Sequence, residues 1–176
     1  MTTSHPVVSR SEWLAARTAL LAQEKAFTKE RDRLSEQRRA LPWVKVEKDY
    51  VFEGSRGKVR LADLFGAHSQ LIVYHFMFGP DWQAGCKSCS FYADHFDSMI
   101  VHLNQRNVGM VVASRAPLDR IAAFKRRMEW RFDWVSSYGS DFNRDFGVSF
   151  TPEDLRKDGP NYNFAPADFP WTRRPG

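Results

Sequence analysis

Two cysteines, Cys86 and Cys89, are the residues whose type and spacing most clearly suggest chemistry in this sequence. A thiolate can attack a disulfide sulfur and form a mixed disulfide. A second thiol one helical turn away can then displace the product and close an intramolecular disulfide. We therefore predict that Cys86 is the catalytic nucleophile and Cys89 the resolving thiol. This chemistry needs neither a metal nor a cofactor.

The position of the pair favours a reactive first thiol. Cys86 stands at the predicted start of a helix that directly follows a buried strand. The unpaired N–H groups and the dipole at a helix start stabilise a thiolate. Lys87 adds a nearby positive charge. We expect the pKa of Cys86 to lie below that of an ordinary cysteine.

Other interpretations of these residues remain open. The two cysteines could be small, partly buried residues with unreactive thiols. A zinc site would need two more ligands, and the nearest histidines, His95 and His102, lie far from the helix start. His75 lies among apolar residues and could approach the cysteines, but a buried histidine is more often a hydrogen-bonded core residue.

The loop before Cys86 contains two residues with more than one interpretation. Trp82 could shape a docking surface beside the thiol, and Asp81 could relay protons. A loop anchor and a turn residue are equally reasonable interpretations. The basic residues 125–127 more often form a solvated helix face than a binding site.

The elements that must position the cysteines form an alternating pattern. Residues 71–78 (LIVYHFMF) predict a strand buried on both faces in the middle of a sheet, and 79–85 predict a loop. Residues 86–104 predict one helix and 108–113 a second strand, giving a parallel βαβ unit. A further helix from Pro117 to Met128 and a strand at 132–135 complete an α/β pattern. A CxxC inside such a unit indicates a thioredoxin-like redox site.

The amino-terminal region predicts a separate element. Ser9 and Glu12 form a capping-box pattern ahead of a long helix that Pro42 ends. Its apolar residues recur every seven positions without the second set that a coiled coil requires. We therefore predict two parts, an amphipathic helix over residues 1–42 that packs on the body and a domain over residues 43–176.

Several shorter segments complete the pattern. Residues 43–46 and 50–53 predict short strands, 54–57 a hairpin loop, and 61–65 a short helix that ends at Gly66. From Ser136 onward we expect a long ordered loop with local helical turns. The final residues, 158–176, contain four of the nine prolines and no apolar period.

Composition excludes several classes of protein. The chain has 176 residues, of which 43% are hydrophobic, enough for one compact domain with a core. Its net charge of +5 comes from the two ends, and no nucleic-acid motif accompanies it, so we expect no nucleic-acid partner. No apolar run approaches the roughly 18 to 20 residues of a membrane span, so no membrane partner is expected. Without a visible secretory signal, the expected location is the cytoplasm.

Several segments together resemble a bacterial thioredoxin-like family known as domain of unknown function 899. They are LIVYHFMFGPDW at 71–82, GCKSCSF at 85–91, ASRAPL at 113–118, KRRMEW at 125–130 and WVSSYGSDFNRDFGVSFT at 134–151. The resemblance implies a thioredoxin-like α/β fold in which Cys86 and Cys89 match the family's CxxC. Members of this family look longer, which implies that the chain lacks the carboxyl-terminal ββα half of the fold. The resemblance supplies no substrate.

Two functions follow from these observations. The first is a cytoplasmic thiol-disulfide oxidoreductase that acts on a disulfide-containing protein or on a small thiol or oxidant. The second is a non-catalytic thioredoxin-like binding or dimerisation module with structural cysteines. In that case the long helix and the aromatic segment near Phe142 and Phe146 would mediate association, in a homodimer for example. A peroxidase variant is weakened by Gln83, where such proteins usually have Thr or Ser.

Overall fold

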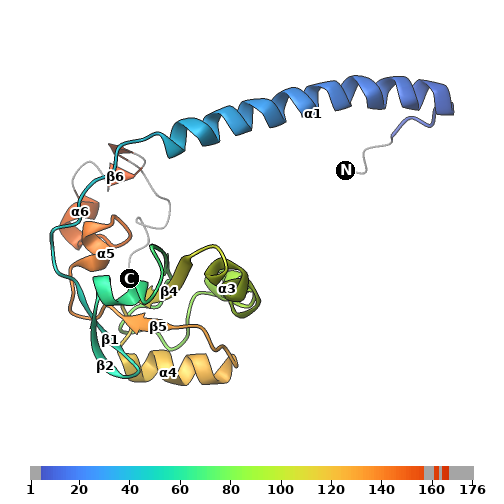
Figure 1. The fold of residues 1–176 in the computed structure, drawn as a ribbon. Helices are drawn as coiled ribbons and strands as arrows, with labels where there is room; N and C mark the ends of the chain where they lie inside the picture. The colour runs from blue at the N-terminus through green and yellow to red at the C-terminus, as the bar shows by residue number, and fades with distance from the viewer. Residues whose placement is uncertain (1–4, 157–160, 163, 167–176) are drawn as a thin grey trace. The chain divides into compact units, whose positions relative to one another are not determined.

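The computed structural model describes residues 5–156, 161, 162 and 164–166 (Figure 1). The chain forms two compact units, residues 1–47 and residues 48–176. Each unit is described by itself below. Within the described residues, no helix combines the length and apolar character needed to cross a membrane.

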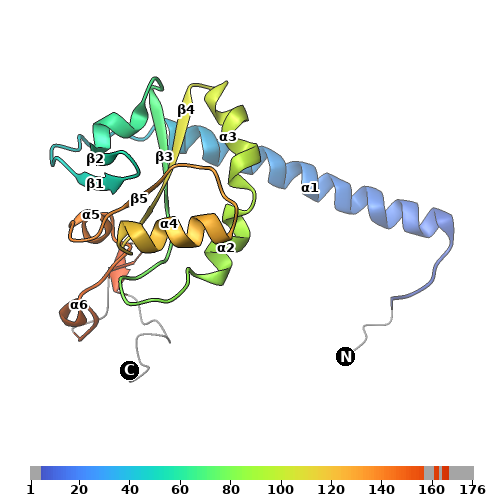
Figure 2. The same cartoon turned by 90° about the horizontal axis from the view of Figure 1, so that it is seen from below.

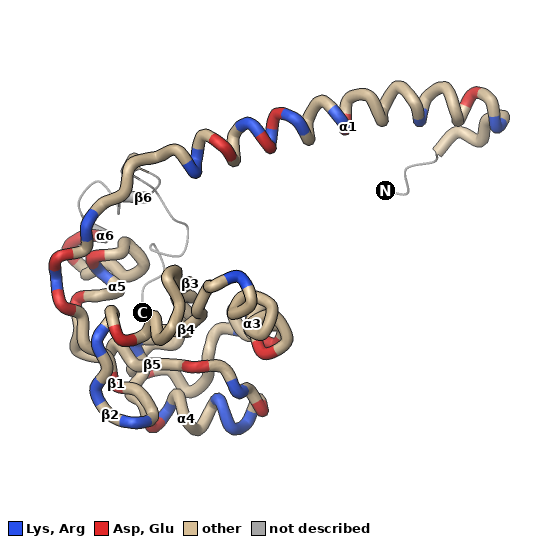
Figure 3. The backbone as a smooth tube through the Cα atoms, viewed as in Figure 1, with Lys and Arg blue, Asp and Glu red and all other residues tan. Residues whose placement is uncertain are grey.

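The first unit is dominated by one helix, α1, which spans Arg10–Arg39. The predicted capping box is present: the Glu12 N–H donates to the Ser9 hydroxyl and the Ser9 N–H donates to the Glu12 carboxylate. No residue of α1 is buried, and charges of both signs are interspersed along it (Figure 3). The packing of this helix on the body stays a prediction.

The expected strand at residues 43–46 is wrong. The segment has no regular secondary structure. Its aromatic and β-branched residues favour a strand, but no described strand supplies the ladder of hydrogen bonds that a strand requires. The hairpin that follows is confirmed, because residues 54 and 57 pair across a two-residue turn.

The second unit is built on a five-stranded sheet in the order β2-β1-β5-β4-β3. Strands β3, β4 and β5 run parallel, whereas β1 runs antiparallel to both β2 and β5. This arrangement confirms the predicted α/β class and the βαβ unit. The strands are β1 (Val51–Gly54), β2 (Gly57–Arg60), β3 (Gln70–His75), β4 (Val108–Ser114) and β5 (Trp134–Ser136).

Strand β3 differs from its prediction in position and length. It lies at the edge of the described sheet, not in the middle, and Ile72 is 42% exposed. The strand ends at His75, three residues earlier than expected. Its apolar run continues because Phe76 and Phe78 are buried against helices after the strand has ended. The apolar run therefore reflects packing of its last residues against helices, not a position in the centre of the sheet.

The helix expected over residues 86–104 is two helices, α2 (Lys87–Ala93) and α3 (Phe96–Asn104). The interruption falls where two carboxylates anchor the chain. Asp94 accepts a hydrogen bond from the Trp130 indole N–H at 2.9 Å, and Asp97 accepts the backbone N–H groups of Arg131 and Phe132. These hydrogen bonds connect both helices to the segment that precedes β5.

The remaining elements follow the predicted order. The segment at 61–65 is a 3-10 helix, η1 (Leu61–Phe65), and α4 covers Leu118–Arg127. After β5 the expected helical turns are α5 (Phe142–Asp145) and α6 (Pro152–Arg156). A small antiparallel pair, β6 (Asn161–Tyr162) and β7 (Ala165–Pro166), was not predicted. Most of the proline-containing final segment lies outside the described residues.

Side chains on the two faces of the sheet form two cores because successive strand residues point to opposite faces. Helices α2, α3 and α4 cover one face of the sheet (Figure 2). The core on that face includes Phe76, Phe124 and Trp134. The other core lies against η1 and α5 and includes Phe52 and Phe142. The carboxyl ends of the three parallel strands thus lie between the two cores.

Candidate dithiol site

Both cysteines lie at the beginning of α2, directly after the loop that follows β3. Cys86 is the residue that precedes the helix, and Cys89 lies in its first turn. Both are free thiols; Cys86 is partly exposed and Cys89 is buried. The Ser90 backbone N–H and hydroxyl both donate to the Cys86 carbonyl, at 2.9 and 3.0 Å. This is the expected placement, with the accessible sulfur first.

The backbone of Met77 contacts both cysteines. Its carbonyl accepts the Cys86 N–H at 2.9 Å, and its own N–H donates to the Cys89 sulfur at 3.5 Å. Met77 is the second residue after β3, so the end of the strand and the start of the helix are held together at this point. The positions of both sulfurs therefore depend on the segment 76–78.

The thiol of Cys86 has a lowered pKa. Burial alone would raise the pKa, but hydrogen bonds to the sulfur outweigh it. They come from the backbone and thiol of Cys89 and from the backbone and hydroxyl of Ser88. These donors favour the thiolate over the neutral thiol. The backbone donors at the helix start were expected. Of the two residues between the cysteines, Ser88 lowers the pKa of Cys86 through its hydroxyl, whereas Lys87, which was expected to do so, is not among the causes.

The thiol of Cys89 has a raised pKa. Burial is the largest cause, and the neighbouring Cys86 adds to it. The Met77 N–H and the Tyr74 hydroxyl oppose the shift by hydrogen bonding to the sulfur. The two thiols thus differ in the way that an attacking and a resolving cysteine require. These roles themselves stay a prediction.

A buried polar network holds the segment that contacts the cysteines. The Ser114 hydroxyl donates to the Phe76 carbonyl at 2.7 Å and accepts the Trp134 indole N–H at 3.0 Å. The Ser137 hydroxyl lies against the Ser114 carbonyl and the Asn143 side chain. The network joins the ends of β3, β4 and β5 to α5. It fixes the carboxyl edge of the sheet beside the dithiol.

The loop at 79–85 is closed by aromatic contacts. An added Cβ at Gly79 would lie 2.9 Å from the Trp82 ring, and one at Gly85 would lie 2.5 Å from the Phe76 ring. The Trp82 carbonyl accepts a hydrogen bond from Arg120 at 3.0 Å. Trp82 is therefore a loop anchor, although the residue is also 44% exposed. No hydrogen bond in the described structure joins Asp81 to either cysteine.

The histidines considered from the sequence lie apart from the thiols. His75 points to the opposite face of β3 and stacks on Phe142, with ring centroids 5.2 Å apart. Burial lowers its pKa. His95 contacts the ring of Phe91. In the part of the chain that the structure describes, no three His, Cys, Asp or Glu side chains are grouped as metal ligands would be.

Three residues near the dithiol were missed by sequence reasoning. Tyr74 could have been found from strand alternation, because it shares a face with Phe76 and therefore points toward the helix that contains Cys89. Ser88 lies inside the CxxC itself and could have been recognised as a donor. Ser114 carried no such signal, since its role depends on the pairing of β4 with β3.

Fold and site together define an α/β domain with a dithiol at the start of the helix that follows the first parallel strand. The chain belongs to the family described as bacterial protein of unknown function, DUF899, whose model matches residues 2–171. The family resemblance inferred from the sequence is therefore confirmed. Comparison with curated proteins gives no match.

Several solved structures are similar to this chain at low identity. One, described as a thiol:disulfide interchange protein DsbE from Chlorobium tepidum, has 17% identity and a TM-score of 0.47, covering 62% of this chain and 72% of that one. A second, described as a protein disulfide isomerase from Bacteroides thetaiotaomicron, has 18% identity and a TM-score of 0.42, covering 59% and 63%. A third, a cysteine-to-serine variant of PrxQ from Xylella fastidiosa, has 13% identity and a TM-score of 0.46, covering 64% and 72%.

Proposed function

We propose that this protein is a thiol-disulfide oxidoreductase in which Cys86 attacks a substrate disulfide and Cys89 resolves the product. The observation that supports this most strongly is the difference between the two thiols. The accessible one has a lowered pKa, and the buried one beside it has a raised pKa. An unreactive structural pair would not require this asymmetry.

The reaction proceeds in two exchanges. The Cys86 thiolate forms a bond to one substrate sulfur, and the other substrate sulfur leaves as a thiolate. The Cys89 sulfur then attacks Cys86 in the mixed disulfide and releases the second substrate thiol. The proton of Cys89 goes to a departing thiolate. The protein dithiol is oxidised by two electrons, and the substrate disulfide is reduced to two thiols.

The surrounding groups support each exchange. Hydrogen bonds from Ser88 and from the helix start stabilise the Cys86 thiolate, both as the attacking group and as the group displaced when the reaction runs in reverse. The Tyr74 hydroxyl and the Met77 N–H donate to Cys89, so its thiolate is stabilised when it forms. Burial keeps Cys89 from competing for external substrate.

The test is differential alkylation and intact-mass measurement of the chain equilibrated in glutathione buffers of graded potential. We expect a reversible loss of two hydrogens, localised to Cys86 and Cys89, at a potential near the cytosolic poise. The Cys86→Ser variant should lose exchange activity altogether. The Cys89→Ser variant should instead accumulate a mixed disulfide with glutathione at Cys86.

Two results would contradict the proposal. Thiols that stay reduced across the whole potential range would favour the binding or dimerisation module with structural cysteines. Bound zinc in the purified chain would make the cysteines metal ligands instead. Metal content is therefore measured on the same sample.

A further inference from the structure

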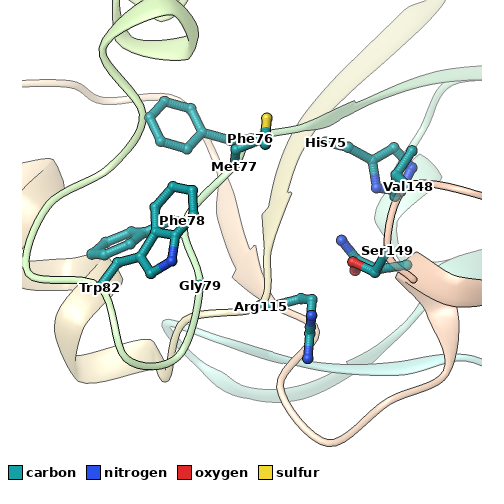
Figure 4. A pocket seen from close by; sticks show the side chains of 10 residues that line it. His75, Phe76, Met77, Phe78, Gly79, Trp82, Arg115, Val148 and Ser149 are labelled. Carbon is teal, nitrogen blue, oxygen red and sulfur yellow. The ribbon is translucent and has the colours of Figure 1, made fainter. Parts of the chain in front are cut away.

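A cavity of about 310 Å³ lies at the carboxyl ends of β3 and β4, beside the loop that leads to Cys86. Figure 4 shows Trp82 on one side of this cavity and Val148 with Ser149 on the other, with Arg115 between them. Met77 also lines the wall. Its volume suits a small molecule or one arm of it, and its walls are mainly apolar.

The strongest polar feature of the cavity is Arg115, the first residue after β4. Arg115 is an exposed residue, and within the described residues its guanidinium forms neither an ion pair nor a hydrogen bond; the described lining contains no Asp or Glu. Asp141 lines a neighbouring cavity with Arg115, but its carboxylate is bonded to Lys48 at 2.8 Å. An arginine in this setting is suited to a carboxylate ligand, which it can bind with two parallel hydrogen bonds.

Two further polar groups in the lining have unused hydrogen-bonding capacity. The His75 Nδ1 atom is buried and has no partner among the described residues. The Asn143 side-chain oxygen contacts the Ser137 hydroxyl, and no described residue bonds to the Asn143 amide nitrogen. Buried polar atoms are rarely left unpaired, because doing so costs free energy. The buried His75 Nδ1 atom therefore indicates a polar ligand atom, and the Asn143 amide nitrogen offers a further donor beside Arg115.

Met77 connects the cavity to the dithiol, although neither cysteine is among the residues that line the cavity. Met77 lines the cavity, and its backbone contacts both Cys86 and Cys89. Trp82 lines the cavity four residues before Cys86. A ligand in the cavity therefore lies against the segment that positions both sulfurs.

We propose that this cavity binds the carboxylate-bearing arm of a small disulfide substrate, with Arg115 pairing with the carboxylate. Asn143 and His75 hydrogen-bond to neighbouring polar atoms of the same arm, and Met77 and Trp82 contact its aliphatic part. The proposal rests on the thiol-disulfide exchange described above and names its substrate class. In a single turnover, the protein dithiol supplies both electrons and both protons, so no other reductant is required.

The test measures single-turnover oxidation of the reduced protein by three small disulfides of similar size. Dithiodipropionate carries carboxylates, bis(hydroxyethyl) disulfide is neutral, and cystamine carries amines. The readout is the ratio of the rate with dithiodipropionate to the rate with the neutral probe. Arg115→Gln should lower this ratio about tenfold, as expected for loss of one charge-assisted hydrogen-bonded pair. Arg115→Lys should restore part of it, and cystamine should gain no advantage from Arg115.

The matched control is Lys58→Gln. Lys58 lies on β2 and does not line this cavity, so the substitution removes one positive charge at a different place. It should leave the ratio unchanged. A ratio that does not change in Arg115→Gln, or that falls equally in Lys58→Gln, overturns the carboxylate site and leaves the proposed exchange intact. Failure of the neutral probe to oxidise the dithiol overturns the exchange itself.

A binding measurement separates recognition from reaction. In the double variant Cys86→Ser, Cys89→Ser, dithiodipropionate cannot react, so its effects report binding only. We expect it to shift the NMR signals of the His75 imidazole, and the neutral probe to shift them less. Unchanged His75 signals at saturating dithiodipropionate would contradict the proposal.

Discussion

The Ser114 side chain holds the Phe76 carbonyl in place, one residue before the backbone that contacts both cysteines. The hydroxyl donates to that carbonyl at 2.7 Å and accepts the Trp134 indole N–H at 3.0 Å. Ser114 is fully buried. A side chain with no contact to either sulfur therefore determines where Met77 presents its N–H and carbonyl to them.

Substitution of Ser114 by alanine should destabilise the fold and alter the dithiol. It removes the donor to Phe76 and leaves the Trp134 indole N–H without its partner. We expect a loss of about 1–3 kcal/mol in the free energy of unfolding, measured with urea. In the folded variant, the alkylation rate of Cys86 should also change. Ser98→Ala, which removes an exposed helix hydroxyl, should have little effect on either measurement.

The pH dependence of alkylation should distinguish the two cysteines. The pKa of Cys86 lies below its ordinary value of 9.0 and that of Cys89 lies above it. As pH rises toward 9.0, Cys86 becomes a thiolate first, so it should react with iodoacetamide at lower pH than Cys89 does. Peptide mapping after timed quenching measures both rates. The reverse order of reaction would contradict the assigned shifts.

The Tyr74 hydroxyl should matter for resolution more than for attack. Tyr74→Phe removes a donor that lowers the pKa of Cys89, so that pKa should rise further. Fewer Cys89 thiolates would then be available, and the mixed disulfide at Cys86 should last several times longer in quenched samples. The initial rate of attack by Cys86 should change little. Equal slowing of both steps would indicate general disruption of the site.

Gly85 should tolerate no side chain. An added Cβ would lie 2.5 Å from the buried Phe76 ring and 3.1 Å from Phe124. Gly85→Ala should therefore destabilise the domain by about 1–3 kcal/mol, as overpacking does, with the thermal midpoint as the readout. Gln83→Ala in the exposed part of the same loop is the control. Full stability of Gly85→Ala would mean that the loop can move away from the aromatic core.

The Lys48–Asp145 pair should contribute stability only above acidic pH. Hydrogen bonds from Lys48 and Tyr50 lower the pKa of Asp145 below its ordinary 3.8. The contribution of a carboxylate with a lowered pKa is present above 3.8 and is lost as pH falls through the folded-state value. Asp145→Asn should therefore lower the thermal midpoint at neutral pH by a small amount. The difference from the native chain should vanish in strong acid.

Much of the fold could be predicted because its signals are local. The alternation of strands and helices, the capping of α1 at Ser9 and the β1–β2 hairpin all follow from short sequence patterns. The position of Cys86 at a helix start could also be predicted from the sequence. The order of the strands could not be predicted. An apolar run such as 71–78 indicates that its residues are buried, but it does not indicate whether a neighbouring strand or a helix buries them.

The errors share a cause in tertiary contacts. The interruption between α2 and α3 coincides with hydrogen bonds to Trp130 and to the segment before β5, which are distant in sequence. Ser114 likewise acquires its role only when β4 pairs with β3. The cavity with Arg115 combines residues from three separate segments. No pattern within a single window could have indicated these sites.

The short length of α2 gives the CxxC its dependence on the whole domain. A helix of seven residues does not persist alone in water, so its order comes from Met77, Trp130 and the core around it. A synthetic peptide that contained only this helix would have two ordinary thiols. The reactivity of the pair therefore depends on the folded chain, and the same four-residue sequence in another context would not have it.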